Sequence, residues 1–161
     1  MATRAVFKPK GADFPATNFP QLTLVNRRPV LAFDAATQET CQWTDVAPQG
    51  LDGALTAVIT YSMASATANL IEFEVSLEAI SDGDAVDTDA ADSFDTVNSG
   101  SATVPGTAGY IDQVSVTLTN ADAIAAGDLF RLRVSRDADD GTNDTATGDL
   151  YLHSVELRDA A

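Results

Sequence analysis

The chain has 161 residues, a length that favours one folded domain, and it carries a net charge of −15 at pH 7. This acidic balance excludes a general nucleic-acid-binding domain, which needs a basic face for the phosphates. One Cys and one His exclude an intramolecular disulfide and a zinc site built from Cys and His. No apolar run approaches the roughly 20 residues of a membrane span, and residues 1–15 lack an apolar core of signal-peptide length, so neither a membrane anchor nor a secretion signal is expected.

The charge is unevenly distributed along the chain. Residues 1–28 contain five Lys and Arg and one Asp, a net charge of +4, whereas residues 29–161 contain four Arg and 23 acids, a net charge of −19. The basic segment also holds Pro9, Pro15 and Pro20, which disfavour helices and central strands. We therefore expect an extended N-terminal arm over residues 1–28 and a folded body over residues 29–161. The arm either packs on its own domain or reaches a neighbouring subunit through charge and aromatic anchors. The candidate partner-binding residues in it are Arg4, Phe7, Lys8, Lys10, Phe14 and Phe19.

The body reads as antiparallel strands. Apolar and polar residues alternate with period two, the pattern of strands with one buried face. The inward-facing sets are Leu55 to Met63, Ile71 to Ala79, Val114 to Leu118, Phe130 to Val134 and Tyr151 to Leu157, and shorter strands are expected at 22–25, 30–33, 40–44 and 101–104. About eight strands in an all-β chain favour a β-sandwich or jelly roll.

Two acidic loops interrupt these strands. Residues 81–100 and 137–149 are rich in Asp and Gly, and a single helical turn is expected near 88–94. Ca²⁺ prefers oxygen ligands of this kind, so a Ca²⁺ site at Asp137, Asp139, Asp140 and Asp144 is one alternative. The other alternative, which we prefer, is a solvated loop in which Asp side chains close turns onto the backbone. We therefore expect no cofactor.

The sequence offers little catalytic chemistry. The only His, His153, lies on the apolar phase of a predicted strand, which favours a core or interface position over a general base. Cys41 and Trp43 share one face of a short strand, as a buried thiol beside an aromatic core residue would. The usual hydrolase, P-loop and dinucleotide-binding fingerprints are absent from the sequence.

Glycan chemistry remains a second alternative. Paired carboxylates for glycoside hydrolysis cannot be assigned in a chain with so many acids, and a Ca²⁺-dependent glycan hydrolase is the least favoured hypothesis. Sugar-binding modules stack sugars on aromatic residues, which make up only 7% of this chain. Exposed aromatics near the acidic loops would indicate glycan binding, and Trp43, Tyr110 and Tyr151 are the candidates.

The order and spacing of several segments resemble a set of small virion proteins of tailed bacteriophages. No single segment is a catalytic fingerprint, so the resemblance rests on their sequence order. The segments are Leu31 to Asp34 with Glu39, Val46 to Pro48, Leu51 to Gly53, Leu55 to Met63, Glu72 to Glu78, Val104 to Gly109, Ala126 to Arg136, Asn143 to Thr145, and Gly148 to Leu157.

The resemblance implies a jelly-roll head-decoration, or cement, protein. Such a protein forms homotrimers that bind the phage major capsid protein on the exterior of the assembled capsid and stabilise the head, without catalysis. It would be made in the host cytoplasm and located in the virion, with no nucleic-acid or membrane partner. Because the same jelly-roll type occurs in tails and fibres, a receptor- or glycan-binding module of a tail or fibre is the alternative.

Overall fold

The computed structural model describes residues 1–51, 54–90 and 92–159. Within these ranges ten strands follow one another, with a 3-10 turn, η1 (Pro9–Gly11), after the first. The described part contains no helix of the length and apolar character needed to cross a membrane. The strands are β1 (Thr3–Phe7), β2 (Gln21–Val25), β3 (Arg28–Phe33), β4 (Glu39–Val46), β5 (Leu55–Met63), β6 (Leu70–Ile80), β7 (Asn98–Thr103), β8 (Asp112–Leu118), β9 (Leu129–Arg136) and β10 (Leu150–Asp159).

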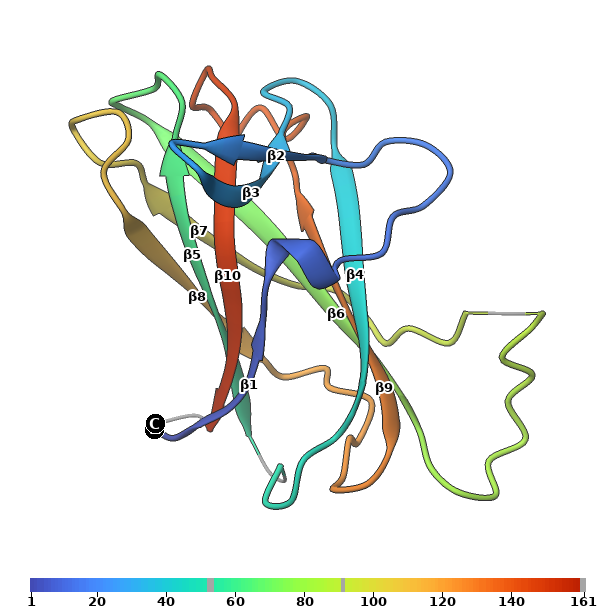
Figure 1. The fold of residues 1–161 in the computed structure, drawn as a ribbon. Coiled ribbons are helices and arrows are strands. Elements are labelled where there is room, and N and C mark those ends of the chain that lie inside the picture. Colours follow the sequence, from blue (N-terminus) through green and yellow to red (C-terminus); the bar gives the residue numbers. More distant parts are fainter. Residues whose placement is uncertain (52–53, 91, 160–161) are drawn as a thin grey trace.

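The strands form two antiparallel sheets that pack face to face (Figure 1). Sheet A has the order β2-β3-β10-β5-β8, and β1 also pairs with β10. Sheet B has the order β4-β9-β6-β7. The expected all-β sandwich of antiparallel strands is therefore confirmed, and the described residues hold ten strands where the sequence indicated about eight.

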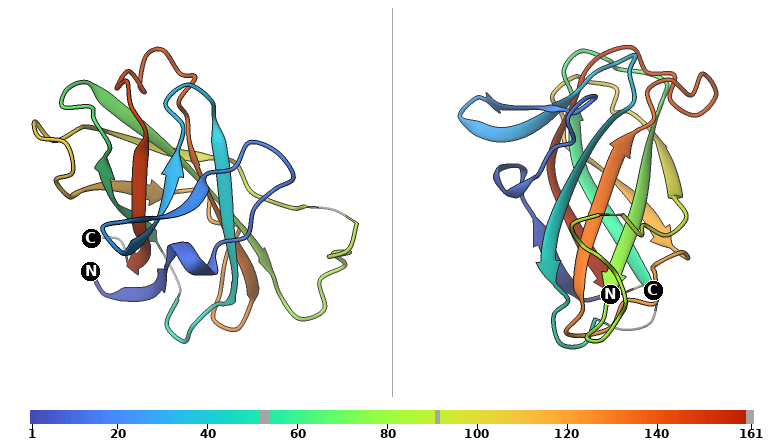
Figure 2. Two further views of the ribbon diagram at one scale, coloured as in Figure 1. Left: turned by 45° about the horizontal axis from the view of Figure 1, so that its top comes forward. Right: turned by 90° about the vertical axis from the view of Figure 1, so that its right-hand side faces the viewer.

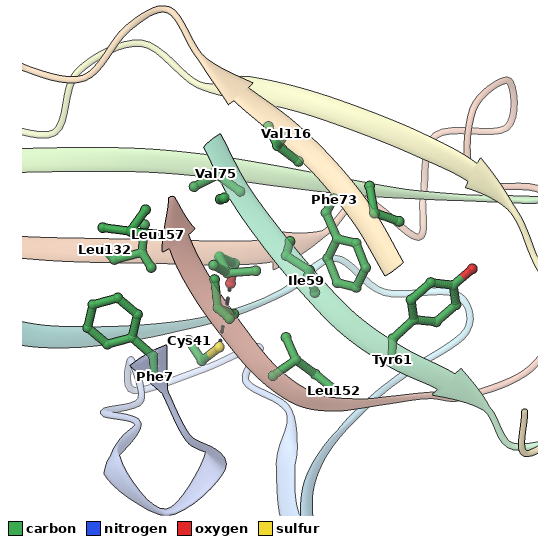
Figure 3. Packing of buried hydrophobic residues seen from close by; sticks show 14 of the residues in the cluster. Phe7, Cys41, Ile59, Tyr61, Phe73, Val75, Val116, Leu132, Leu152 and Leu157 are labelled. Atoms are coloured by element: carbon green, nitrogen blue, oxygen red, sulfur yellow. Dashed lines mark hydrogen bonds between the residues drawn. The ribbon is translucent and has the colours of Figure 1, made fainter. Parts of the chain in front are cut away.

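The core lies between the sheets and follows the predicted alternation on the long strands. On β5, the residues Leu55, Ala57, Ile59, Tyr61 and Met63 are at most 1% exposed. Edge-to-face contacts of aromatic rings cross the core, where Phe73 meets Phe33 and Tyr61 with centroids 6.3 and 6.1 Å apart. Figure 3 shows this packing around Ile59 and Phe73.

The last strand differs from the prediction because its ladder contains a bulge. The pairing with β5 shifts register between Leu152 and Ser154, which reverses the alternation of the residues on either side. Leu152 and Val155 both face the core and are fully buried, whereas Tyr151 and His153 are only half-buried. The prediction that Tyr151 and His153 share the buried face with Val155 is therefore wrong.

The N-terminal segment packs on the body of its own chain. β1 runs beside the second half of β10, and β3 runs beside its first half. Phe7 is 5% exposed and contacts Trp43 and Phe130, with ring centroids 5.8 and 6.0 Å apart. The backbone carbonyl of Lys8 accepts a hydrogen bond of 2.9 Å from the Trp43 indole. Residues 1–28 thus supply two strands, a 3-10 turn and the first residue of β3.

The long acidic loop is described over residues 81–90 and 92–97, and β7 begins at Asn98, before the position that the sequence indicated. A turn closes at Ala90, whose N–H donates to the Asp87 carbonyl. The prediction of a helical turn near 88–94 includes residue 91, which lies outside the described residues, and residues 92–94 are not helical. Gly100 allows β7 to approach β8, because a Cβ there would lie 3.0 Å from Val116. The edges of the two sheets meet at this contact.

A buried arginine holds the loop after β9. Arg136 is fully buried at the end of the strand and donates two hydrogen bonds of 2.9 Å to the Asp144 carboxylate. Its remaining N–H groups donate to the backbone carbonyls of Asp34, Ala146 and Gly148. This network fixes residues 137–149 on the sandwich.

Candidate functional site

Three rungs of polar side chains cross the outer face of sheet B. Because side chains alternate along a strand, the same register that buries Leu132 and Val134 turns their neighbours outward. Each rung takes one residue from β4, β9 and β6, which face one another in the antiparallel register. The rungs are Thr40, Ser135 and Glu74; Gln42, Arg133 and Ser76; and Thr44, Arg131 and Glu78.

Two loops turn this face into a groove. The segment between η1 and β2 lies along β4, and residues 81–90 and 92–97 extend over the other side of the sheet (Figure 2, right). Two cavities of about 250 and 310 Å³ adjoin on the face, since both are lined by Gln38, Thr40 and Arg133. We call them together the polar groove. Its other lining residues are Glu74, Ser76, Val97 and Ser135 in one cavity and Pro15, Thr17, Asn18, Gln42 and Asp92 in the other.

The lining side chains of the polar groove hold one another in place. Gln38 donates to Glu74 at 2.6 Å, and Arg133 donates to Ser76 at 3.0 Å. The hydroxyls of Thr40 and Ser135 lie 2.8 Å apart. The groove therefore presents preorganised donors and acceptors, a surface suited to a ligand with many hydroxyl groups.

An ion pair supports one end of this face. Arg131 donates to both oxygens of Glu78 at 2.6 and 2.7 Å, and it also reaches Asp92 at 2.6 Å. Burial opposes ionisation of Glu78, but Arg131 and the hydrogen bonds from Ser93 outweigh it and lower the pKa of this carboxyl. The ring of Phe94 packs against the guanidinium groups of Arg131 and Arg133, at 4.7 and 4.1 Å.

The partner-binding residues expected in the N-terminal segment separate into distinct places. Arg4 pairs with Asp159 at 2.7 Å, and Phe7 lies in the core. The side chains of Lys8 and Lys10 are exposed around η1. The rings of Phe14 and Phe19 lie 5.6 Å apart in the loop beside the polar groove, and Phe14 is 37% exposed. The structure therefore does not gather these residues into one patch.

The acidic loop after β9 divides its carboxylates between two roles. Asp144 is 5% exposed and binds Arg136, so its oxygens stabilise the fold. Asp140 accepts hydrogen bonds from the N–H groups of Thr142 and Asn143, which are Asx turns of the kind expected from the sequence. Asp139 is exposed beside Asp137, to which it is hydrogen-bonded.

A different trio of carboxylates meets beside this loop. One oxygen from each of Glu72, Asp137 and Asp140 lies within 4.8 Å of the others. Burial and the hydrogen bond with Asp139 raise the pKa of Asp137 to about 7. Burial also raises the pKa of Glu72. None of the three is among the residues that line the polar groove.

The aromatic candidates have different environments. Trp43 is 3% exposed and belongs to the core, together with the fully buried Cys41, as the strand phase predicted. Tyr110 is 65% exposed in the loop before β8, and Tyr151 is half-buried on the outer face of sheet A. Neither Gln38 nor Arg133 was among the residues predicted from the sequence. The polar phase of β9 places Arg133 outward, whereas Gln38 lies in the loop before β4 and has no such signal.

Comparison with known proteins shows the fold. No family model matches the chain, and no curated protein matches it. A carbohydrate-binding module of Clostridium stercorarium, solved with cellobiose, superposes with a TM-score of 0.57 at 14% identity, over 99% of this chain and 98% of that one. A module of Cellvibrio japonicus, CBM35 of Abf62, superposes with a TM-score of 0.53 at 10% identity, over 98% of this chain and 94% of that one. A two-module xylanase fragment of Clostridium thermocellum, complexed with xylohexaose, gives a TM-score of 0.53 at 12% identity over 99% of this chain and 29% of that one. The chain thus has the jelly-roll sandwich fold of these modules.

Proposed function

We propose that the chain is a non-catalytic glycan-binding module and that the polar groove on sheet B is its binding site. The observation that carries this proposal is the groove itself, which runs over two adjoining cavities and is lined mainly by hydrogen-bonding side chains fixed by one another. Modules of the same fold bind carbohydrate, among them the one solved with cellobiose. The sequence resemblance to virion proteins supports a setting in a phage tail or fibre, where such a module would contact the host surface.

Binding without catalysis agrees with how the outer face of sheet B, on which the groove lies, uses its charged groups. Glu78 is held ionised by Arg131, which leaves it unsuited to donate a proton near neutral pH. Glu74 is engaged by Gln38. The face therefore offers fixed polar contacts, and a sugar chain would lie across β4, β9 and β6 with its hydroxyls toward Arg133 and Thr40.

The test compares substitutions of two glutamines, one that lines the polar groove and one that lies outside it. Gln38→Ala removes a lining side chain, whereas Gln113→Ala removes a residue on the outer face of sheet A that donates to Thr60 at 3.1 Å. Titration calorimetry would measure binding of linear neutral hexaoses of β-linked glucose and of xylose. We expect Gln38→Ala to weaken binding about fivefold, the effect of losing roughly one hydrogen bond, and Gln113→Ala to change it less than twofold. Absence of binding by the folded wild-type chain, or equal effects of the two substitutions, would refute the proposal.

Capsid decoration is a second candidate, favoured by a different surface. The hairpin of β2 and β3 stands out from the body (Figure 2), and its edge strand exposes Leu22 by 49% and Leu24 by 64%. An edge strand with exposed apolar side chains is a pairing surface that proteins normally cover. A homotrimer on the major capsid protein, the assembly that the resemblance to cement proteins implies, would cover it if this strand lies in the contact.

Decoration can be tested without truncating the N-terminus. Removal of residues 1–20 would take Phe7 out of the core, so point substitution is the cleaner experiment. The double variant Leu22→Ser, Leu24→Ser should lose binding to expanded capsids that lack this protein, as measured by sedimentation, and should run as a monomer in light scattering. Unchanged capsid binding, or a wild-type monomer that does not bind capsids, would exclude this role.

A further inference from the structure

The largest of the described cavities lies on the opposite side of the molecule from the polar groove. It measures about 680 Å³ and has three sides. Ser62 on β5 and Tyr151 and His153 on β10 form its floor on the outer face of sheet A. The β2–β3 hairpin supplies one wall, and the loop that precedes β8 supplies the other; both lie at the upper left of Figure 1. The wall residues are Val25, Asn26 and Arg28 on the hairpin, and Ala108, Gly109 and Ile111 on the loop.

The bulge in β10 is what creates this floor. Without the register shift, Tyr151 and His153 would lie on the core face with Val155, as the alternation in the sequence predicts. With it, the His153 Nε2 comes within 2.9 Å of the Ser62 hydroxyl, which fixes the imidazole against the sheet. A local irregularity of this kind often re-aims side chains toward a site.

The residues that line the cavity carry a net positive charge, although the protein as a whole is acidic. The sequence has 24 Asp and Glu, yet no lining side chain of the cavity is acidic. Arg28 forms no ion pair with any acidic residue in the described ranges. Burial lowers the pKa of His153, and the charge of Arg28 lowers it further; no carboxylate counters them. The unneutralised Arg28 charge therefore favours an anionic ligand here.

The remaining lining groups narrow the chemistry of that ligand. Asn26, Ser62 and Tyr151 offer hydrogen-bonding groups, and Val25 and Ile111 offer apolar contacts. A cavity that combines one guanidinium with several neutral polar groups matches a ligand with one carboxylate and several hydroxyls. A phosphate-rich ligand would require several cationic groups, and the cavity has one permanently charged side chain.

We propose that this cavity is a binding site for a carboxylate-bearing sugar, with Arg28 receiving the carboxylate and with Asn26, Ser62 and Tyr151 contacting the hydroxyls. The site is separate from the polar groove and does not depend on what binds there. The two sites together would let the module contact an acidic sugar on one sheet and a neutral chain on the other.

The hairpin turn provides a matched pair of variants. Arg27 and Arg28 are adjacent and exposed, but only Arg28 lines the cavity. Arg28→Gln and Arg27→Gln therefore change the net charge equally. Glucuronate and glucose form a matched pair of probes, because they share the ring and differ in the carboxylate.

Titration calorimetry should detect glucuronate binding with a Kd on the order of 1 mM, the range expected for a monosaccharide of this size. Glucose should bind at least tenfold more weakly. Arg28→Gln should weaken glucuronate binding about tenfold, whereas Arg27→Gln should change it less than twofold. Because the chain has a single His, proton NMR of His153 reports occupancy directly, and its pKa should rise when glucuronate is bound.

Three outcomes would overturn the proposal: no binding of glucuronate at 20-fold its expected Kd, equal binding of glucose, or equal losses in the two arginine variants. Inorganic phosphate that binds as tightly as glucuronate would overturn the assignment to a carboxylate. Glucuronate binding by the Gln38→Ala variant distinguishes failure of this proposal from failure of the proposal that the polar groove binds a glycan. It should be unchanged even if neutral hexaoses do not bind the polar groove at all.

Discussion

Arg136 should be the most sensitive charged residue of the sandwich to substitution. Arg136→Met keeps the length of the apolar stem but leaves the Asp144 carboxylate, whose side chain is 1% exposed, without its partner. Breaking a buried pair on one side costs about 3–5 kcal/mol, and three backbone carbonyls lose a donor as well. We expect a loss of about 4 kcal/mol, a large part of the roughly 5–15 kcal/mol that keeps a domain folded.

For a chain of 161 residues, an unfolding entropy of about 2.1 cal/mol/K per residue converts this loss into a fall in Tm of about 12 °C. Urea denaturation followed by circular dichroism would measure the free energy of unfolding. Arg158→Met is the control, since its pair with Glu156 at 2.8 Å is partly exposed and should contribute less than about 1 kcal/mol.

A second variant separates the ion pair from the packing of the arginine stem. Arg136→Met combined with Asp144→Asn removes the unpaired charge and should recover at least about 1 kcal/mol of the loss. If Arg136→Met cost no more than Arg158→Met, or if Asp144→Asn added its full penalty to that of Arg136→Met, the reasoning would be refuted.

Two further predictions concern the same loop region. The raised pKa of Asp137, about 7, means that the folded state binds a proton more tightly than the unfolded state, so this residue favours folding less as the pH rises from about 4 through 7. After allowance for solvent screening, Asp137→Asn should raise the stability by about 1 kcal/mol at pH 8 and by nothing near pH 4; an effect that does not vary with pH in thermal melts would contradict this. Gly148 has φ 145°, and a Cβ there would lie 2.6 Å from the Ser65 hydroxyl, so Gly148→Ala should cost about 1–3 kcal/mol in urea denaturation. Gly141→Ala, where nothing lies within 4 Å, should stay within about 0.5 kcal/mol, and equal losses would remove the steric argument.

The long strands were predictable because burial on one face leaves a direct record in the sequence. β5 and β6 alternate apolar and polar residues along most of their length, and the structure buries the predicted face of each. The same alternation identified the inward residues of β8 and β9. Turn residues mark the boundaries between these strands. The alternation and the turns together were sufficient to predict an antiparallel β-sandwich.

Strand pairing and β-bulges cannot be predicted from the alternation of apolar and polar residues. The shift in β10 inserts one residue into the ladder, and its sequence alternates as an unbroken strand would, so Tyr151 and His153 were assigned to the wrong face. β1 was missed because five residues beside a proline-rich stretch carry too little periodicity, and its place depends on β10 at the other end of the chain.

The polar groove on sheet B and the cavity on sheet A could not be predicted from the sequence, for a related reason. The polar residues of β4 and β9 are visible as an outward phase, but outward residues on most strands simply meet water. What distinguishes Gln38 and Arg133 is that two loops distant in sequence rise beside them. Periodicity predicts which face of a strand is exposed to solvent. Which of these exposed faces forms a cavity depends on the loops that surround it in the folded chain.

The pairing of the first and last strands has a mechanical consequence. Thr3 lies opposite Arg158, and the N–H of Asp159 donates to the carbonyl of Ala2, so β1 begins and β10 ends at the same corner of the sandwich. A force that pulls these two strand ends apart would load the hydrogen bonds of the ladder one at a time, starting with the contacts of Asp159 to Ala2 and Arg4. Tension along the chain would therefore strip β1 from the sheet at low force, and would draw Phe7 out of the core with it. A protein held by both ends would need a neighbour on β1 to resist that opening.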